Sequence, residues 1–201
     1  MTRISPVVDE QLSCDQAGFR PGRSCCGQVL NLTQYIDGFE TQLKTGAVLV
    51  DLTAAYDTVN HKALLFKVAK VVKNATVVKI LESLLNNRRY FVEMNSKKSR
   101  WRLQKNELPQ GSVLAPMLFN IYTNDQPQFE NIHRFIYADD LCIATQSKSF
   151  EIIENRLTDA LEILSDYYKQ WFLNANPGKT QVCAFHLKPT ETSESGGRIK
   201  N

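Results

Sequence analysis

Two short apolar runs, each ending in aspartate, constrain the fold of this 201-residue chain more than any other feature. The run Val48-Leu49-Val50 leads directly to Asp51, and so compact a run with β-branched residues predicts a buried strand. Farther along, the runs 135–137 and 141–143 flank Ala138-Asp139-Asp140, which predicts a β-hairpin with acids at its tip. The chain therefore has to place carboxylates at the ends of buried strands.

Hydrophobic periodicity predicts helices and further strands around these two features. In chain order we expect helix 26–44, strand 47–52, helices 61–73 and 76–86, strands 88–94 and 99–103 joined by a turn at 95–98, a helix reaching 122, the acidic hairpin, helix 149–173 and strand 180–187. This order predicts an α+β fold in which helices pack on one face of an antiparallel sheet. The polar residues 188–201 predict a disordered tail.

Composition narrows the class of protein. Hydrophobic residues make up 43% of the chain and charged residues 22%, which is typical of a globular protein. The five cysteines are odd in number and fit no zinc spacing, which indicates a reducing compartment. No signal peptide opens the chain and no apolar run reaches membrane-spanning length, so we expect an intracellular protein without a membrane partner.

Three neighbouring carboxylates imply a cation. Asp51, Asp139 and Asp140 would repel one another and raise one another's pKa. Carboxylates beside an apolar core are costly unless a cation neutralises them, and Mg²⁺ prefers hard oxygen ligands that it shares with substrate phosphates. Two such ions can activate an attacking hydroxyl and stabilise a leaving oxygen. An isolated Asp-Asp pair would more simply form an exposed turn, but the second strand-end acid favours the metal site.

Five segments resemble the reverse transcriptases of non-LTR (LINE/jockey-like) retrotransposons, and they occur in that family's order. They are QAGFRPGRS at 16–24, DLTAAYD at 51–57, LPQGSVLAP at 108–116, the YADD motif at 137–140 and NPGKT at 176–180. The resemblance implies a right-hand polymerase fold, with fingers and palm over residues 1–187. It also implies RNA-directed DNA polymerase activity with two Mg²⁺ ions, for which Mn²⁺ is a possible substitute. The implied partners are an RNA template, a DNA primer and deoxynucleoside triphosphates, in the nucleus or cytoplasm.

The resemblance assigns the central site residues. Asp51 and Asp139 match the main metal ligands and Asp140 a supporting acid, while the backbone carbonyl of Leu52 matches a further metal ligand. Tyr56 matches the bulky residue that blocks a 2′-hydroxyl and so favours deoxynucleotides. From the residues alone, Tyr56 is equally a core aromatic that follows a strand.

Four further positions match peripheral roles. Arg20 and Arg23 match residues that contact the triphosphate, a role that suits the two-pronged hydrogen bonding of arginine, although a solvated basic loop explains them too. Gln110 matches a contact to the incoming nucleotide and template; otherwise it is a polar residue preceding a helix. Lys179 matches a catalytic general acid that protonates the leaving pyrophosphate; otherwise it is a surface lysine after a turn.

Some features depart from the family's pattern. Ala54 stands where relatives often carry lysine or another polar residue, and Glu107 stands where glycine is common before Leu108. The resemblance covers fingers and palm only, so we expect a truncated domain without a thumb. The alternative function is a catalytically inactive retroelement remnant that binds RNA or protein. A bulky Tyr56 disfavours an RNA-templated RNA polymerase, and a metal-dependent nuclease would explain neither Tyr56 nor Gln110.

Basic and aromatic residues also alternate along the expected hairpin over 88–103. They are Arg88, Arg89, Tyr90, Lys97, Lys98, Arg100, Trp101 and Arg102. Basic surfaces with stacking aromatics suit single nucleic-acid strands. A solvated sheet face with Trp101 packed inward is the equally weighted alternative.

Overall fold

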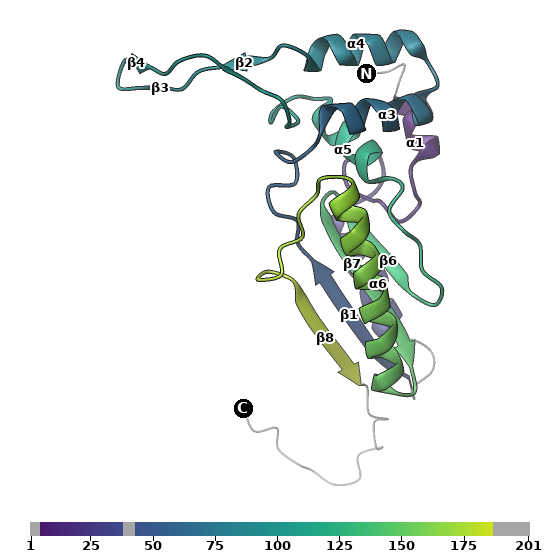
Figure 1. The fold of residues 1–201 in the computed structure, drawn as a ribbon. Helices are drawn as coiled ribbons and strands as arrows, with labels where there is room; N and C mark the ends of the chain where they lie inside the picture. Colours follow the sequence, from purple (N-terminus) through teal and green to yellow (C-terminus); the bar gives the residue numbers. More distant parts are fainter. Residues whose placement is uncertain (1–4, 38–42, 187–201) are drawn as a thin grey trace, which may run out of the picture.

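The computed structural model describes residues 5–37 and 43–186 (Figure 1). In chain order its elements are α1 (Ser5–Gln11), α2 (Cys25–Asp37), β1 (Lys44–Val50), α3 (His61–Val72), α4 (Ala75–Leu85), β2 (Arg89–Tyr90), β3 (Glu93–Met94), β4 (Lys97–Lys98), β5 (Arg102–Leu103), α5 (Ala115–Thr123), β6 (His133–Tyr137), β7 (Asp140–Ser147), α6 (Phe150–Gln170) and β8 (Gln181–His186). The expected tail at 188–201 and positions 38–42 of the expected helix 26–44 lie outside the described residues.

A four-stranded antiparallel sheet carries the fold. Its strands run in the order β6-β7-β1-β8, so β1 and β7 are central. The register pairs Val50 with Leu141 and Leu49 with Gln181, which brings the end of β1 beside the start of both neighbours. The predicted α+β class with an antiparallel sheet is confirmed.

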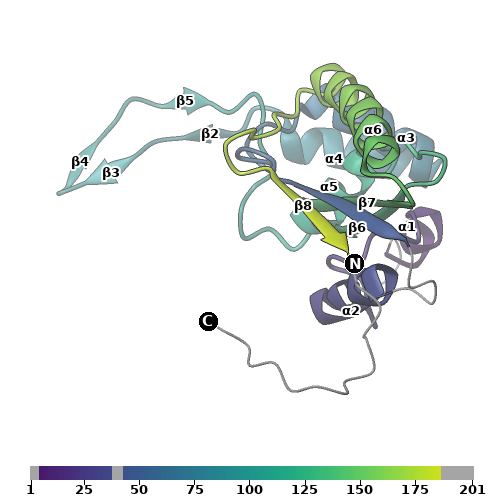
Figure 2. The same ribbon diagram turned by 90° about the horizontal axis from the view of Figure 1, so that it is seen from below.

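Helix α6 covers one face of the sheet, and α3, α4 and α5 pack together on the same side (Figure 2). Ser149 begins α6 by accepting a hydrogen bond from the Glu151 amide, as N-cap serines do. Gly46 in β1 permits the close approach, because a Cβ there would lie 2.3 Å from the Ile153 Cγ2 atom of α6. The helical layer is therefore fitted tightly onto the middle of the sheet.

Helix α2 lies on the opposite face, a second layer that the sequence did not predict (Figure 2). Leu32 and Tyr35 of α2 pack against a small cluster formed by Ala47, Cys142 and Ala144 of the two central strands. Because α2 covers only part of this face, Leu49 at the end of β1 stays exposed. The acidic strand ends therefore open onto a partly covered sheet face.

A buried lysine joins three helices on the α6 side. Lys67 of α3 donates hydrogen bonds to the Tyr122 carbonyl (2.7 Å) and the Tyr167 hydroxyl (3.0 Å), and it pairs with Asp125. Its Nζ also lies 3.8 Å from the centroid of the Trp171 ring, within the range of a cation–π interaction. Burial lowers the pKa of Lys67 to about 8, and the hydrogen bond and charge of Asp125 oppose that shift.

Two other segments differ from expectation. Helix α1 was not predicted, although Pro6 in its first turn is a recognised helix-start signal. The predicted strands 88–94 and 99–103 form only two-residue pieces. The turn is shorter than the predicted 95–98, because only Asn95 and Ser96 adopt the positive φ of the turn and Lys97–Lys98 already form β4. Residues 88–105, hereafter the arm, project away from the rest of the molecule (Figures 1 and 2). Within the described ranges, no helix is both long and apolar enough to cross a membrane.

Candidate active site

The structure brings the three predicted acids together. Asp51 follows β1, Asp140 begins β7, and Asp139 lies in the two-residue loop that joins β6 to β7. The pKa of Asp140 is raised above its ordinary value, first by burial and then by the charges of Asp139 and Asp51. Such mutual repulsion is what closely spaced carboxylates produce, and it favours binding of a cation.

A glutamine from the N-terminal block fixes the hairpin tip. The side chain of Gln16, only 4% exposed, accepts hydrogen bonds from the Ala138 amide (2.9 Å) and the Gly18 amide (2.7 Å). Its own amide group donates to the Ala138 carbonyl at 3.1 Å. Ala138 adopts a positive φ of 59°, which is uncommon for a residue other than glycine and needs support from its surroundings. Gln16 therefore holds the residue next to Asp139.

Gly18 allows the N-terminal block to pack closely against Ala138. A Cβ at Gly18 would lie 2.2 Å from the Ala138 backbone nitrogen, so no larger residue fits without moving the tip. The side chain of Asn120 in α5 donates to the Gly18 carbonyl at 2.8 Å and so anchors the segment around Gly18. We call this group of Gln16, Gly18 and Ala138 the tip contact. The sequence placed Gln16 and Gly18 in a recognised block but contained no signal for this role.

The backbone of Asp51 is paired with a neighbouring segment, and its side chain lies near Lys179. The segment 174–176 pairs with 51–53, with the Thr53 amide donating to the Asn174 carbonyl and the Asn176 amide to the Asp51 carbonyl, both at 2.8 Å. These bonds do not use the Leu52 carbonyl. The buried Oδ2 atom of Asp51 has no hydrogen-bond partner among the described residues, and the Lys179 ammonium lies 3.9 Å away.

Asp51 and Lys179 line a cavity of about 350 Å³ on the sheet face that α2 covers only in part. Its lining also includes Tyr137 and Asp140 of the hairpin and Gln28 of α2. Lys179 is thus placed beside the acids, as a residue acting on a substrate there would have to be.

Tyr56 lies close enough to Asp139 for the charge of that carboxylate to act on its hydroxyl. Its ring stacks on Phe119 with centroids 4.8 Å apart and planes 9° from parallel. Burial, and then the charge of Asp139, raises the pKa of Tyr56 to about 12. Its buried hydroxyl has no hydrogen-bond partner among the described residues. Tyr56 is therefore both a core aromatic and a neighbour of Asp139, so the two interpretations of its sequence position are compatible.

The segment around Gln110 is tied to the loop that follows β1. The Leu108 amide donates to the Tyr56 carbonyl at 2.9 Å, and the exposed Gln110 side chain donates to Asp57 at 3.2 Å. Glu107 adopts a φ of 92°, a conformation that favours glycine. Its amide donates to the Val59 carbonyl at 3.0 Å, so the surrounding structure holds it in that conformation.

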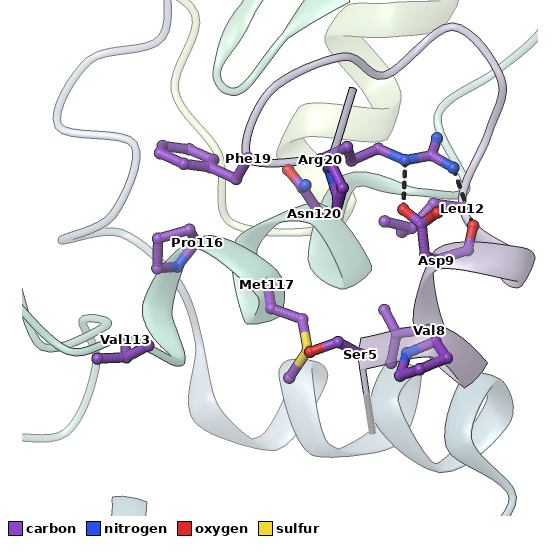
Figure 3. A pocket seen from close by; sticks show the side chains of 12 residues that line it. Ser5, Val8, Asp9, Leu12, Phe19, Arg20, Val113, Pro116, Met117 and Asn120 are labelled. Carbon is purple, nitrogen blue, oxygen red and sulfur yellow. Dashed lines mark hydrogen bonds and ion pairs between the residues drawn. The ribbon is translucent and has the colours of Figure 1, made fainter. Parts of the chain in front are cut away.

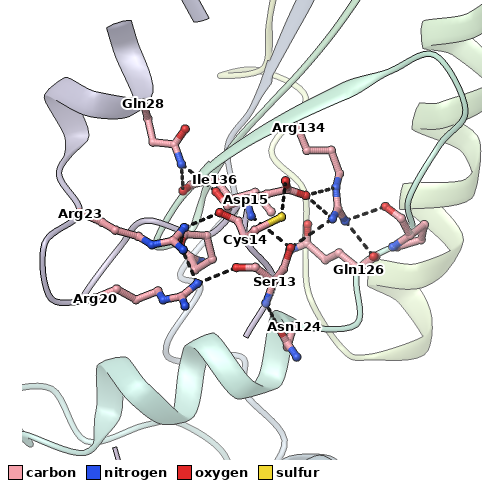
Figure 4. Close-up of polar contacts among 12 residues, drawn as sticks. Ser13, Cys14, Asp15, Arg20, Arg23, Gln28, Asn124, Gln126, Arg134 and Ile136 are labelled. Carbon is pink, nitrogen blue, oxygen red and sulfur yellow. Dashed lines mark hydrogen bonds and ion pairs between the residues drawn. The ribbon is translucent and has the colours of Figure 1, made fainter. Parts of the chain in front are cut away.

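The two arginines are not brought to the acids. The side chain of Arg20 is buried, with its Nε donating to Asp9 (2.6 Å) and its Nη1 to the Ser13 carbonyl (2.7 Å). Arg20 lines a separate cavity of about 500 Å³ between α1 and α5 (Figure 3). Arg23 donates to the carbonyls of Cys14 and Gln16 (Figure 4). In this conformation both arginines support the segment before the tip contact. Their contact with a triphosphate stays a prediction.

Arg134 of β6 supports the same segment. It donates to Asp15 and to the Gln126 carbonyl, the latter at 2.9 Å (Figure 4). No signal in the sequence predicted the contact between Arg134 and Asp15, because these residues lie 119 positions apart. Three arginines therefore fix the chain around residues 13–16.

The donor set suits a hard cation, although no complete metal cage is preformed. Within residues 5–37 and 43–186, no three His, Cys, Asp or Glu side chains are grouped closely enough to hold a metal ion. Mg²⁺ typically keeps several waters and takes only one or two protein carboxylates together with substrate phosphates. The unpartnered Oδ2 of Asp51 and the repulsion felt by Asp140 fit that mode of binding.

Comparisons with known proteins agree with this geometry. Residues 1–195 match the protein family described as reverse transcriptase (RNA-dependent DNA polymerase). The probable RNA-directed DNA polymerase from transposon BS of Drosophila melanogaster is 33% identical over 197 residues, covering 92% of this chain and 22% of that relative. The RNA-directed DNA polymerase from mobile element jockey of Drosophila funebris is 26% identical, covering 85% of this chain and 19% of its own length. The chain thus spans about a fifth of these relatives.

Solved structures show the same fold. Telomerase from Candida tropicalis, in complex with a TWJ fragment of telomeric RNA, aligns with a TM-score of 0.69 at 13% identity, covering all of this chain and 35% of its own. The apo enzyme truncated from its C-terminal domain aligns with a TM-score of 0.65. The predicted fingers–palm architecture is therefore confirmed. The match over residues 1–195 and the similarity to the transposon polymerases show that the chain belongs to the reverse transcriptase family, in its non-LTR, jockey-like retrotransposon branch.

Proposed function

We propose that this chain carries the active site of an RNA-directed DNA polymerase that extends a DNA primer along an RNA template. The observation that supports this most is the convergence of Asp51, Asp139 and Asp140 at the ends of the two central strands, with Tyr56 beside Asp139. In the reaction, the primer 3′-hydroxyl attacks the α-phosphorus of a deoxynucleoside triphosphate. A new phosphorus–oxygen bond forms, the bond to the β-phosphate bridge breaks, and pyrophosphate leaves.

The acids would hold Mg²⁺, and Mn²⁺ is a possible substitute. Asp51, Asp139, the Leu52 carbonyl and, in support, Asp140 are the ligands in this proposal. Two bound ions would lower the pKa of the attacking hydroxyl and neutralise charge on the phosphate oxygens. The tip contact holds Ala138, the residue before Asp139, and the 174–176 segment pairs with the backbone of Asp51. Precise positioning of this kind is the protein's main contribution to phosphoryl transfer.

Two other residues act on the nucleotide in this proposal. Tyr56, fixed by its stack on Phe119, excludes a 2′-hydroxyl and so selects deoxynucleotides. Lys179, beside Asp51, donates a proton to the departing pyrophosphate. Gln110 contacts the incoming nucleotide and template, and Arg20 and Arg23 contact the triphosphate only if they first release their present partners.

Primer extension tests the proposal. The purified chain is incubated with an RNA template, an annealed DNA primer, Mg²⁺ and either deoxynucleotides or ribonucleotides. We expect primer-dependent incorporation of deoxynucleotides and little of ribonucleotides, with Tyr56→Ala relaxing that preference. A folded protein that incorporates nothing at high concentration would contradict the proposal.

A catalytically inactive remnant that binds RNA or protein is the second candidate. It is favoured by the binding of Arg20 and Arg23 to backbone carbonyls of the protein, which occupies both side chains that a triphosphate would need. The same extension assay separates the two functions.

A further inference from the structure

The arm, residues 88–105, carries a charge opposite to that of the rest of the chain. It holds seven basic residues and one acidic residue, a formal charge of +6. Because the whole chain carries +3, the remaining residues carry −3. So strong a segregation of charge on one projecting element marks it as a site for a polyanion.

Aromatic and apolar side chains on the arm are exposed rather than packed. Trp101 is 64% exposed and Tyr90 45% exposed. The alternative in which Trp101 packs inward is therefore wrong. The rings of Phe91 and Trp101 meet edge to face, with centroids 4.7 Å apart and planes at 75°, so Phe91 covers at most one face of the exposed indole and leaves the other open for stacking.

Basic residues lie next to these rings on the same two-stranded ribbon. Tyr90 pairs directly with Arg102, and Met94 pairs with Lys97, so each pair lies on one face of the ribbon. The Lys98 ammonium lies 5.2 Å from the centroid of the Phe91 ring and 3.6 Å from Glu93. Open rings beside cations suit a strand with unstacked bases and a phosphate backbone.

The base of the arm is fastened to the loop that follows β1. The Gln104 amide donates to the Arg88 carbonyl at 2.8 Å and closes the ribbon. Just after the arm, the Glu107 amide donates to the Val59 carbonyl at 3.0 Å, and the Glu107 carbonyl lies 2.8 Å from the Nε2 atom of His61. The Leu108 amide then reaches the Tyr56 carbonyl. A strand bound along the arm would therefore lead toward Tyr56 and the acids.

We propose that the arm is a binding surface for single-stranded RNA, which it holds by phosphate contacts and base stacking before the strand reaches the acids. This inference rests on the proposed function for the identity of the strand as template. The bound strand stacks on Trp101 and Tyr90 and pairs its phosphates with Lys97, Arg100 and Arg102.

Fluorescence anisotropy with a labelled RNA of about 12 nucleotides, without Mg²⁺ or nucleotides, tests the proposal. The triple variant Lys97→Ala/Arg100→Ala/Arg102→Ala is compared with a control that removes three exposed charges elsewhere, Lys62→Ala/Lys79→Ala/Lys148→Ala. We expect the arm variant to lose at least about tenfold more affinity than the control. The slope of log Kd against log salt concentration should also be smaller by about 2 than that of wild type, since each lost phosphate contact contributes about 0.7 to the slope.

Stacking is tested separately. Trp101→Ala should weaken RNA binding roughly tenfold but leave binding of an abasic strand of equal length unchanged. A DNA strand of the same sequence reports whether the surface distinguishes RNA from DNA, and tighter binding of DNA would overturn the assignment to RNA. Equal losses in the arm and control triples, or equal effects of Trp101→Ala on both strands, would overturn the proposal and leave a protein partner as the occupant.

The binding assay does not depend on catalysis. Asp139→Asn should bind RNA as tightly as wild type. Arm-dependent binding without primer extension would retain this inference and remove the proposed function. If the chain extends primers but its arm variants bind RNA normally, the proposed function is retained and this inference is removed.

Discussion

Removing the Gln16 side-chain amide should destabilise the fold and displace the hairpin tip. Gln16→Met keeps the length of the side chain but leaves the Ala138 and Gly18 amides and the Ala138 carbonyl without their partner. A buried polar group left unsatisfied costs about 1–3 kcal/mol. At the low end of that range, three such groups lower the free energy of unfolding by about 3 kcal/mol, a large share of the ~5–15 kcal/mol typical of a domain.

Urea unfolding monitored by circular dichroism measures the loss. Gln34→Met, an exposed position on α2, is the matched control and should change the free energy of unfolding by less than about 0.5 kcal/mol. Gln16→Glu retains the acceptor for both amides but points a carboxylate at the Ala138 carbonyl, so it should also destabilise. A loss from Gln16→Met no larger than that of the control would refute the tip contact as a structural element.

Other contacts lead to predictions of comparable sharpness. Gly18→Ala forces a Cβ against the Ala138 backbone, so we expect a loss of about 2 kcal/mol or more in urea unfolding, whereas a neutral result would mean that the tip moves freely. Lys67→Ala removes a buried charge and its hydrogen bonds and should cost about 3 kcal/mol, against almost nothing for the exposed Lys62→Ala. Because the pKa of Lys67 is lowered to about 8 while the unfolded chain stays protonated to about 10.5, the stability of wild type relative to Lys67→Ala should rise between these two pH values. Glu107→Gly relieves a φ of 92° and should raise the melting temperature; a lower one would show that Glu107 is not strained.

The sequence predicted the acidic site because its evidence is local. A compact apolar run fixes where β1 ends, and two flanking runs fix the hairpin, so Asp51, Asp139 and Asp140 could be placed on strand ends directly. Their mutual approach then follows from β1 pairing with β7. Helices α3 to α6 were predicted for the same reason, since their periodicity is contained within each segment.

What the sequence could not predict depends on contacts between distant positions. Gln16 meets Ala138 across 122 positions, and Lys67 meets Tyr167 across 100. A polar residue that is buried and fully partnered resembles a surface residue in the sequence. For the same reason Arg20 and Arg23 resembled free ligands for phosphate, whereas both are bound to backbone carbonyls of the neighbouring segment.

The most direct test of the central claim compares Asp139→Asn with wild type in primer extension on an RNA template. Asparagine preserves the shape of the side chain but removes the charge that binds a divalent cation, so we expect extension to be lost while the circular dichroism spectrum and melting temperature stay those of wild type. Asp159→Asn, an exposed substitution on α6, controls for the change in net charge and should extend primers normally. Ordinary extension by Asp139→Asn would contradict the assignment of these acids as the catalytic centre.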